Sequence, residues 1–485
     1  MSERKRKLEE MTKGNHLGDA YAATLDRMKA QGGGRSRLGM DALMWVSNSE
    51  RPLHTSELCH ALGVKIGSAD LDDENVPTIR TLVGCSLGLI VVDASSTVGI
   101  VHLTLQEYLS NNPSLFRSPH SMIAEVCLTY LNFRRIRELS PALSSAPPSF
   151  PLLEYASCYW GKHVGRQKAE SVTPLALVLL NRFEQHISSR FLLLHSDKNR
   201  HWPEPCFGRS SSHNGFTGLH GGAFLGFGEI VAALLATKEW NINKTDAVGR
   251  TALAWAATRG HENVVRILLR QKDVNANPRD IESGRTPLHL AAKGGYEGVA
   301  KLLLEREDTN PNTRDTEYGQ TPLWWAAKGG YEGVAKLLLE RKDTNPNTRD
   351  IRYGQTPLVY AARGGHEGVV KLLLEREDIN PDIPGLSGET ALALAASRGH
   401  PGIVKLLSKP KPSCSTAIGT GKAPGRSSPE PPTCPPPPKP LPPAARPLFS
   451  IAIPFFVIIS AILLFYVFAR IGPSLPVLSL ESFYR

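Results

Sequence analysis

The sequence predicts a mainly α-helical chain, in which a small helical domain with one β-hairpin and a helical connector precede a stacked array of short helix pairs. Two observations predict this fold class. A threonine-headed pattern returns every 34 or 35 residues in the second half of the chain, and a period of this length is typical of stacked repeats. Near the C-terminus, residues 447–469 carry no charge, which predicts a single transmembrane helix.

The N-terminal half predicts short helices followed by a hairpin. Apolar spacing and β-branched residues predict three helices and then two strands, at residues 38–46, 55–62, 77–87, 89–92 and 98–103. Three helices and a hairpin form a winged-helix layout, which we place at residues 36–135. A flexible N-terminus (1–35) would precede this domain, and a helical connector (136–210) would follow it.

The charge of this domain argues against nucleic-acid binding. Residues 51–100 carry three basic and six acidic side chains, and a net negative charge opposes contact with phosphates. A DNA-associated regulator, whose binding to a duplex would weaken with salt, is therefore the least favoured function. We expect no nucleic-acid partner.

Six similar units fill residues 214–408. Their leading threonines are 34 or 35 residues apart, at Thr217, Thr251, Thr286, Thr321, Thr356 and Thr390. In the third unit, Thr286 is suited to cap a helix that begins at Pro287, and the glycines at 294–295 allow a tight turn before a second helix. No unit can bury its own apolar face, so neighbouring units must stabilise one another. We expect Leu337→Ala, in a second helix, to cost about 2–5 kcal/mol.

The units resemble the ankyrin repeat. The resemblance rests on T-P-L-H-L-A-A at 286–292, T-P-L-W-W-A-A at 321–327 and T-P-L-V-Y-A-A at 356–362. The first and last units lack the proline, and we interpret the first as a cap. Ankyrin arrays bind proteins through their turn tips and through the concave face of their first helices. The resemblance therefore implies a protein partner.

A basic stripe is expected on this concave face. Lys293, Lys328 and Arg363 directly follow the Ala-Ala pair in three consecutive units, so the ankyrin layout would align them. We predict that they bind an acidic protein partner. The alternative is a solvated face that has no partner.

Four aromatic residues of the first helices are further candidates for partner binding: Trp255, Trp324, Trp325 and Tyr360. Aromatic side chains are favoured anchors at interfaces, and plain packing is the alternative for each. Adjacent helical residues point about 100° apart, so we expect one of Trp324 and Trp325 in the core and the other at the surface. Trp324 stands where the ankyrin pattern has His.

The N-terminal half resembles a second family. Residues 51–62, 85–92 and 101–109 are similar to the winged-helix region that follows the NACHT ATPase module in fungal NLR-like (STAND) ankyrin proteins. Residues 155–163, with Tyr-Trp-Gly at 159–161, are similar to the connector that this family places before its repeats. The phosphate-binding loop of a NACHT module, G-x-x-x-x-G-K-[ST], does not occur in the chain.

The sequence gives no indication of catalysis. Its seven cysteines form no C-x-x-C pair, and an H-E-x-x-H zinc motif does not occur. We therefore predict a non-enzymatic protein with no catalytic residues, no cofactor and no metal site.

Composition defines the C-terminal segments. Residues 409–446 are rich in proline and carry six basic side chains against one acidic side chain, which predicts an extended linker. The uncharged stretch that follows is long enough to span a bilayer, which predicts a membrane anchor at 447–470 and a short tail at 471–485. The N-terminal body would then lie in the cytoplasm. A buried helix is the alternative for the uncharged stretch.

Two functions follow from these features. The favoured one is a membrane-anchored scaffold or sensor that binds a protein partner through its ankyrin repeats. The alternative is a regulatory fragment of a NACHT-type signalling ATPase, of the kind that acts in innate immunity or heterokaryon incompatibility. The ATPase module would then come from a longer gene product or from a second chain.

Overall fold

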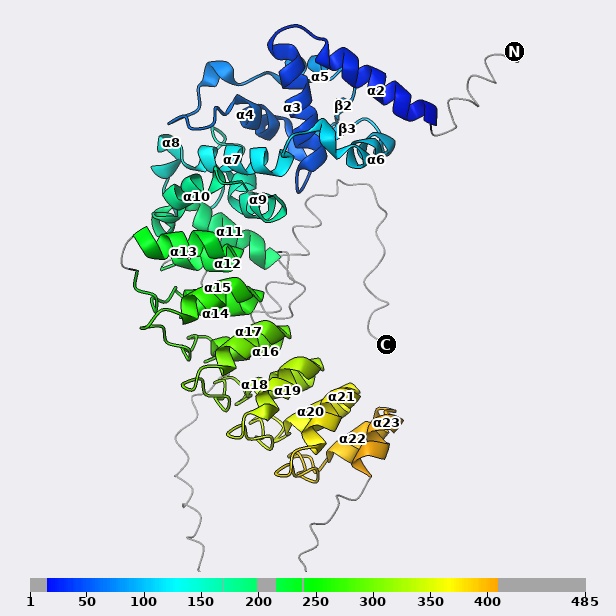
Figure 1. Ribbon diagram of the computed structural model, residues 1–485, viewed down its shortest axis with the longest axis vertical. Coiled ribbons are helices and arrows are strands. Elements are labelled where there is room, and N and C mark those ends of the chain that lie inside the picture. Colours follow the sequence, from blue (N-terminus) through cyan, green and yellow to red (C-terminus); the bar gives the residue numbers. More distant parts are fainter. Residues whose placement is uncertain (1–14, 168, 199–214, 238–239, 409–485) are drawn as a thin grey trace, which may run out of the picture. The chain divides into compact units, whose positions relative to one another are not determined.

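The computed structural model describes residues 15–167, 169–198, 215–237 and 240–408 (Figure 1). These residues belong to one unit of the chain, Met1–Ser413. Most of them are helical, and their buried apolar side chains form one continuous core from the N-terminal domain to the last helix pair.

The N-terminal domain combines helices with a three-stranded antiparallel sheet. The strand order is β1-β3-β2, and Val98 in β3 pairs with both Leu53 and Val92. The elements of this domain are α2 (Asn15–Lys29), α3 (Gly34–Asn48), β1 (Leu53–His54), α4 (Thr55–Gly63), η1 (Asp73–Asn75), α5 (Ile79–Cys85), β2 (Ile90–Val92), β3 (Thr97–Ile100), α6 (Leu103–Asn111), η2 (Pro113–Leu115), α7 (Pro119–Leu131) and α8 (Arg134–Arg137).

Helix α2 lies in a region for which the sequence predicts a flexible N-terminus. Leu25 and Met28 are buried on its inner face. The ring of Tyr21 lies 5.7 Å from that of Tyr108 in α6, and its hydroxyl bonds to the hydroxyl of Thr104 at 2.8 Å. Apolar residues at helical spacing therefore attach residues 15–29 to the domain.

The connector consists of helices that lie between the N-terminal domain and the first helix pair. Its elements are α9 (Leu153–Arg166), α10 (Val172–Leu180), η3 (Phe183–Gln185) and α11 (Ile187–Lys198). The ring of Trp160 lies 5.7 Å from that of Phe227, and the ring of Phe183 lies 6.0 Å from that of Phe216. These contacts cover the N-terminal end of the array.

The second half contains six stacked helix pairs, which we number as repeats 1 to 6. The pairs are α12 (Gly218–Leu225) with α13 (Gly228–Thr237), α14 (Ala252–Arg259) with α15 (Glu262–Leu269), α16 (Pro287–Gly294) with α17 (Glu297–Leu304), α18 (Pro322–Gly329) with α19 (Glu332–Glu340), α20 (Pro357–Gly364) with α21 (Glu367–Leu374), and α22 (Ala391–Ser397) with α23 (Pro401–Leu407).

Local chemistry explains where these helices begin and end. Thr286 caps α16, and Pro287 is its first residue, where the missing backbone N–H costs nothing. Gly295 ends the helix at φ 70°, a left-handed conformation that glycine adopts without strain. Leu288 and Leu303 then turn inward to the shared core.

A ladder of asparagines joins the turns of neighbouring repeats. The amide of Asn312 donates to the Asp343 carbonyl oxygen at 2.6 Å, and its side-chain oxygen accepts from the Asn345 N–H at 2.7 Å. The same pair of bonds to the next turn is made by Asn243, Asn277 and Asn347. We call these four residues the asparagine ladder.

The predicted transmembrane helix is not supported. A helix needs about 20 apolar residues to cross a bilayer. The longest helices of the described residues, α2 and α3, have 15 residues each and include charged side chains, and no helix in that part of the chain could span a membrane. The segments at 409–446, 447–470 and 471–485 lie outside the described residues.

This finding corrects both the predicted fold class and the predicted localisation. The fold that the structure supports is a helical array behind a small mixed domain and a helical connector. The predicted localisation, a single-pass C-terminal anchor with the N-terminal body in the cytoplasm, is wrong, because none of the described helices could span a membrane.

Candidate functional site

The three predicted basic residues occupy equivalent positions in consecutive repeats. Lys293, Lys328 and Arg363 lie in the last turns of α16, α18 and α20, where a cation is favoured by the helix dipole. Lys328 is exposed, and the other two are half-buried.

Each of these cations lies over an aromatic ring. The Lys293 Nζ is 4.7 Å from the centre of the Trp325 ring, and the Lys328 Nζ is 4.9 Å from that of Trp324. The Arg363 Cζ is 4.8 Å from the centre of the Tyr360 ring. Such contacts contribute roughly 0.5–1 kcal/mol each at exposed sites. We call this group the cation–aromatic surface: Lys293, Lys328, Arg363, Trp324, Trp325 and Tyr360.

The three rings of this surface form a chain of edge-to-face contacts. The centres of the Trp324 and Trp325 rings are 5.0 Å apart, and those of Trp324 and Tyr360 are 4.4 Å apart. The expectation that one tryptophan would be exposed is wrong, because Trp324 is 2% exposed and Trp325 is 9% exposed. Lys293 and Lys328 cover the ring of Trp325, which removes it from water.

The indole N–H groups of Trp324 and Trp325 are buried without a hydrogen-bond acceptor among the described residues. Buried polar groups are nearly always hydrogen-bonded in folded proteins. Both N–H groups are shielded from solvent, so the groups that a partner could reach on this surface are its cations.

Trp255 stands apart from this surface. It is fully buried in α14, and its indole N–H donates to the Asp246 carboxylate at 2.8 Å. Its ring packs edge-to-face on those of Phe216 and Phe224. These contacts indicate a packing role for Trp255.

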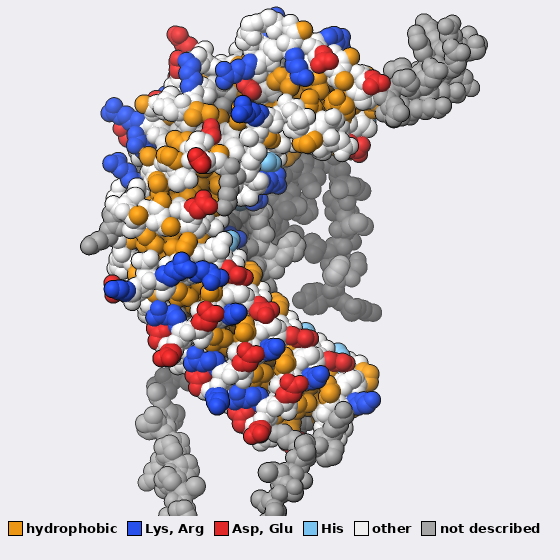
Figure 2. All heavy atoms as spheres, in the orientation of Figure 1, with side chains coloured by type: hydrophobic (Ala, Val, Ile, Leu, Met, Phe, Trp, Pro, Cys, Tyr) orange, Lys and Arg blue, Asp and Glu red, His pale blue; other side chains and the backbone are white. Residues whose placement is uncertain are grey.

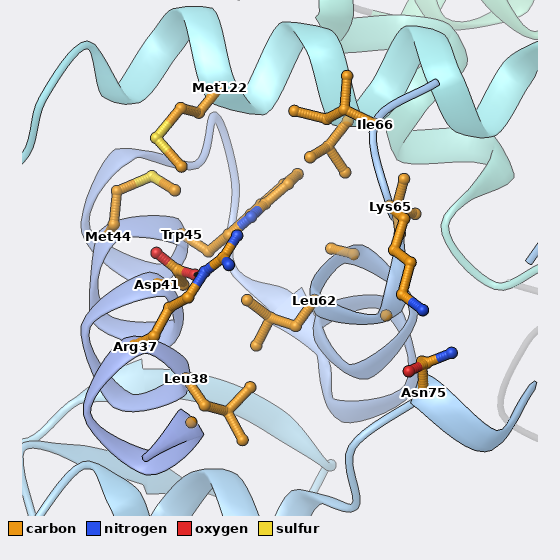
Figure 3. A pocket seen from close by; sticks show the side chains of 15 residues that line it. Arg37, Leu38, Asp41, Met44, Trp45, Leu62, Lys65, Ile66, Asn75 and Met122 are labelled. Atoms are coloured by element: carbon orange, nitrogen blue, oxygen red, sulfur yellow. Dashed lines mark ion pairs between the residues drawn. The ribbon is translucent and has the colours of Figure 1, made fainter. Parts of the chain in front are cut away.

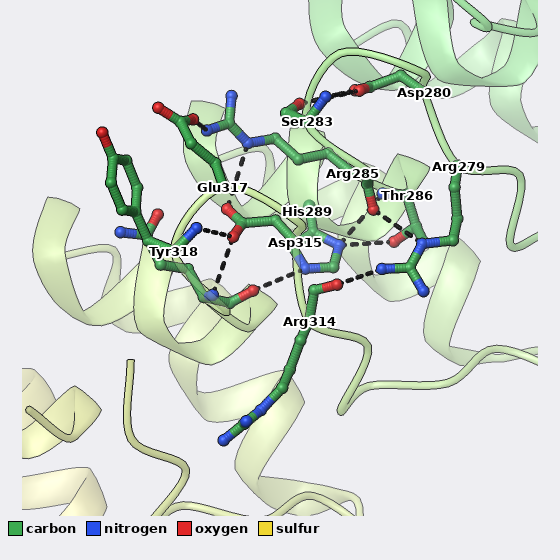
Figure 4. Close-up of polar contacts among 12 residues, drawn as sticks. Arg279, Asp280, Ser283, Arg285, Thr286, His289, Arg314, Asp315, Glu317 and Tyr318 are labelled. Atoms are coloured by element: carbon green, nitrogen blue, oxygen red, sulfur yellow. Dashed lines mark hydrogen bonds and ion pairs between the residues drawn. The ribbon is translucent and has the colours of Figure 1, made fainter. Parts of the chain in front are cut away.

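Arg285 belongs to the same neighbourhood but was not predicted from the sequence. Its guanidinium lies 4.7 Å from the centre of the Trp325 ring and pairs with Glu317 at 3.0 Å and with Asp315 at 3.5 Å (Figure 4). Because Arg285 comes before the capping threonine, the spacing of the first-helix residues gave no signal for it. Because the Arg285 side chain is almost fully buried, it contacts the Trp325 ring inside the protein and not at its surface.

His289, at the position that Trp324 takes in repeat 4, has a structural role. Its Nδ1 accepts from the Thr286 hydroxyl at 2.8 Å, and its Nε2 lies 3.1 Å from the Gln320 carbonyl oxygen (Figure 4). The Thr286 N–H also donates to Nδ1 at 3.2 Å, so Nδ1 carries no proton. The proton therefore lies on Nε2, which donates to the carbonyl oxygen, and the ring is neutral. Burial lowers the pKa of His289 to about 4.

A cavity of about 440 Å³ lies in the N-terminal domain, mainly between α3 and α4 (Figure 3). Met44, Trp45 and Leu62 give it apolar walls, and Asp41 pairs with Arg37 at 3.5 Å. Burial raises the pKa of the Asp41 carboxyl. Four of the lining side chains are charged or polar, Arg37, Asp41, Lys65 and Asn75, and the other lining residues are apolar or glycine.

The sequence also contains a G-x-S-x-G motif at residues 84–88. Ser86 is buried, and its hydroxyl donates to the Val83 carbonyl oxygen at 2.8 Å. The motif begins in the last two residues of helix α5 and precedes strand β2, whereas a nucleophile elbow runs from strand to helix. In the part of the chain that the structure describes, no cluster of three His, Cys, Asp or Glu side chains suits a metal ion.

The stacked helix pairs define the second half as a helical repeat protein. Comparison with protein families identifies the repeats as ankyrin repeats, because the family model described as "Ankyrin repeats (3 copies)" matches residues 185–280, 274–350 and 343–417. Residues 25–121 match the winged helix domain of GPI inositol-deacylase. No curated protein matches the chain. The predicted ankyrin array and winged-helix domain are therefore confirmed.

Proposed function

We propose that this protein is a non-enzymatic scaffold or sensor that binds an acidic protein segment on its cation–aromatic surface. Ankyrin repeats imply protein–protein interaction. The observation that supports an acidic partner is the row formed by Lys293, Lys328 and Arg363, each held over a ring. Because the rings restrain these side chains, binding costs less conformational entropy than it would with mobile lysines.

The local arrangement of charge also supports this surface. In the view of Figure 2, basic and acidic side chains are interspersed over the repeats. On the second helices, for example, Lys301 alternates with Glu297 and Glu305. The three cations of the first helices instead follow one another without an acidic residue at the equivalent positions.

Charge reversal tests this proposal. The variant Lys293→Glu/Lys328→Glu/Arg363→Glu is compared with a matched control on the second helices of the same repeats, Lys301→Glu/Lys336→Glu/Lys371→Glu. Fluorescence anisotropy would measure the binding of an Asp- and Glu-rich peptide, with an Asn- and Gln-rich peptide of equal length as the neutral probe.

We expect the first-helix variant to bind the acidic peptide at least about tenfold more weakly, a loss of about 1.4 kcal/mol. The control variant should retain most of the affinity, and added salt should weaken binding to the wild-type chain. Equal losses in both variants would show that net charge alone drives binding, and the proposal would then fail.

A second proposal concerns the winged-helix domain, which hints at a NACHT-related protein. Val91, Val101 and Leu103 are exposed on the hairpin and at the start of α6, with Leu103 at 79%. Val101 and Leu103 border a cavity of about 660 Å³ that is also lined by Arg51 and Pro52. We propose that a NACHT-type ATPase module packs on this apolar face.

Sequencing of full-length transcripts tests this second function. A phosphate-binding loop encoded in frame upstream would support a receptor fragment. If all transcripts begin at Met1, only a module on a second chain remains. The variant Leu103→Asp should then abolish binding to that module, while Val178→Asp, on an exposed valine of the connector, should not.

A further inference from the structure

Apolar side chains recur at the tips of the turns that precede the first helices. Ile281, Ile351 and Leu386 occupy equivalent positions and are 76%, 67% and 70% exposed. Thr316 fills the same position in the turn between the first two, at the same spacing of 35 residues. We call these four residues the tip row. Exposed apolar side chains that gather in one place are typical of a binding surface.

Backbone hydrogen bonds between successive turns hold the tip row in place. The Thr316 N–H donates to the Ser283 carbonyl oxygen at 2.8 Å, and the Ile351 N–H donates to that of Tyr318 at 2.7 Å. The Leu386 N–H donates in the same way to the Tyr353 carbonyl oxygen of the preceding turn, at 2.7 Å. The row is therefore ordered before any partner binds, which lowers the entropic cost of binding.

Buried aspartates also fix the bases of three of the four tips, those of Ile281, Thr316 and Ile351. Figure 4 shows the turn that carries Thr316, where the Asp315 carboxylate accepts the N–H groups of Tyr318 and Gln320 at 3.0 Å each. In the preceding turn, Asp280 accepts the N–H and the hydroxyl of Ser283. The backbone of these turns is therefore rigid where a partner would bind.

Two tyrosines border the tip row, and charge on the row is nearly balanced. Tyr353 is exposed, Tyr318 is half-buried, and the Arg352 guanidinium carbon lies 5.1 Å from the centre of each ring. Glu317 is already paired with Arg285. An apolar partner with little charge suits this surface better than a strongly acidic or basic one.

The spacing of the row selects the conformation of the partner. Packed helices lie roughly 8–10 Å apart, so equivalent tips should recur at about that distance. A polyproline II segment presents one side chain in three to the same face, about every 9.3 Å. A strand presents every second side chain, about every 6.8 Å, and therefore does not match.

An α-helix matches this spacing less well than polyproline II does. Seven helical residues rise about 10.5 Å, so only one side chain in seven would meet the row. From the row, its rigidity and its tyrosine border, we propose that the tips of repeats 3 to 6 bind a proline-rich segment in polyproline II conformation. This surface is separate from the cation–aromatic surface, and the inference does not depend on an acidic partner.

Peptide binding to the full-length chain tests the inference. The probe is a fluorescent peptide of four Pro-Pro-Leu triplets, measured by anisotropy. One control peptide has the same composition with its leucines clustered, and another is helical with leucine at every seventh position. We expect the triplet peptide to bind at least about tenfold more tightly than either control.

Variants of the row sharpen the test. Ile351→Ser should weaken binding of the triplet peptide at least about fivefold, and Thr316→Ile, which completes the apolar row, should strengthen it. Ile66→Ser provides the matched control, because Ile66 is an exposed isoleucine of the N-terminal domain. All three changes are at exposed positions, so unchanged melting temperatures are expected.

Several outcomes would overturn the inference. It fails if the clustered or the helical peptide binds as tightly as the triplet peptide, or if Ile351→Ser binds like the wild-type chain. The variant Lys293→Glu/Lys328→Glu/Arg363→Glu should leave the affinity for the triplet peptide unchanged. Loss of acidic-peptide binding alone in that variant would separate the two proposals.

Discussion

Repeats 3 and 4 are nearly identical over residues 291–315 and 326–350, where Glu307 against Lys342 is the single difference. Their first helices differ more, with His289-Leu290 in α16 and Trp324-Trp325 in α18. Both helices nevertheless have eight residues and the same threonine cap, proline start and glycine end. The two repeats therefore share the residues that form the turn and the second helix, while the two residues in the middle of the first helix differ in their chemistry.

Repeats 3 and 4 also contact the repeat that follows them differently, through His289 in repeat 3 and Trp324 in repeat 4. His289 links Thr286 to the Gln320 carbonyl oxygen across 31 residues, a polar joint to the following turn. Trp324 replaces that joint with an aromatic contact to Tyr360 of the next repeat. The same array can therefore use hydrogen bonds at one joint and ring contacts at the next.

The largest expected effects come from the shared core. Leu303→Ala and Leu338→Ala remove equivalent, fully buried side chains of repeats 3 and 4. Each should cost about 2–5 kcal/mol of unfolding free energy, measured by urea denaturation. Leu337→Ala should cost less, because Leu337 is half-buried. If the two variants lost different amounts of unfolding free energy, Leu303 and Leu338 would not be equivalent core positions of repeats 3 and 4.

A smaller effect is expected at the glycine that ends α16. Gly295 has φ 70°, and an added Cβ would lie 2.5 Å from the Tyr331 ring. Gly295→Ala should therefore cost more than the roughly 1–2 kcal/mol of the left-handed conformation alone. Gly399 in repeat 6 has φ 74° and no neighbour within 4 Å among the described residues, so Gly399→Ala isolates the backbone cost. Equal melting temperatures in the two variants would contradict the packing of Tyr331 on Gly295.

The smallest effect is a difference in pH dependence. The pKa of His289 falls from an ordinary value of 6.5 to about 4 on burial. The unfolded chain therefore binds more protons between these values, and stability is full above pH 6.5 and falls as pH drops toward 4. His289→Val introduces the residue that repeat 5 has at this position, Val359.

We expect His289→Val to lower stability at neutral pH by about 1–2 kcal/mol, since Thr286 and the Gln320 carbonyl lose a partner. The loss of stability between pH 6.5 and 4 should become shallower in the variant. Other buried histidines such as His220 remain in both proteins and provide the common background. Parallel pH profiles would mean that His289 is not the titrating group.

Much of the array could be predicted from the sequence because its signals are local. The period, the threonine caps and the turn glycines fix the helix pairs, and the spacing of Lys293, Lys328 and Arg363 places them on equivalent first-helix positions. Periodicity could not tell Leu337 from Leu338, since adjacent positions share the edge of an apolar face. Nor could it show that both Trp324 and Trp325 would be buried, because the cover comes from lysine side chains of two repeats.

Features that depend on distant contacts were missed. Strand β1 has two residues and exists through pairing with β3, more than 40 residues away. Helix α2 is held by α6, and Arg285 meets Trp325 only after two repeats stack. The apolar C-terminal segment was assigned to a membrane from its length and lack of charge, two properties that do not identify what covers such a segment.

The asparagine ladder makes the joints between the turns that precede repeats 2 to 6 alike, because Asn243, Asn277, Asn312 and Asn347 offer the same two bonds to whichever turn follows. A 35-residue unit can therefore be gained or lost between two joints without creating a new kind of contact. Gene duplication and deletion could change the number of units while the end units stay intact, so the length of the binding surface can evolve independently of its local stability.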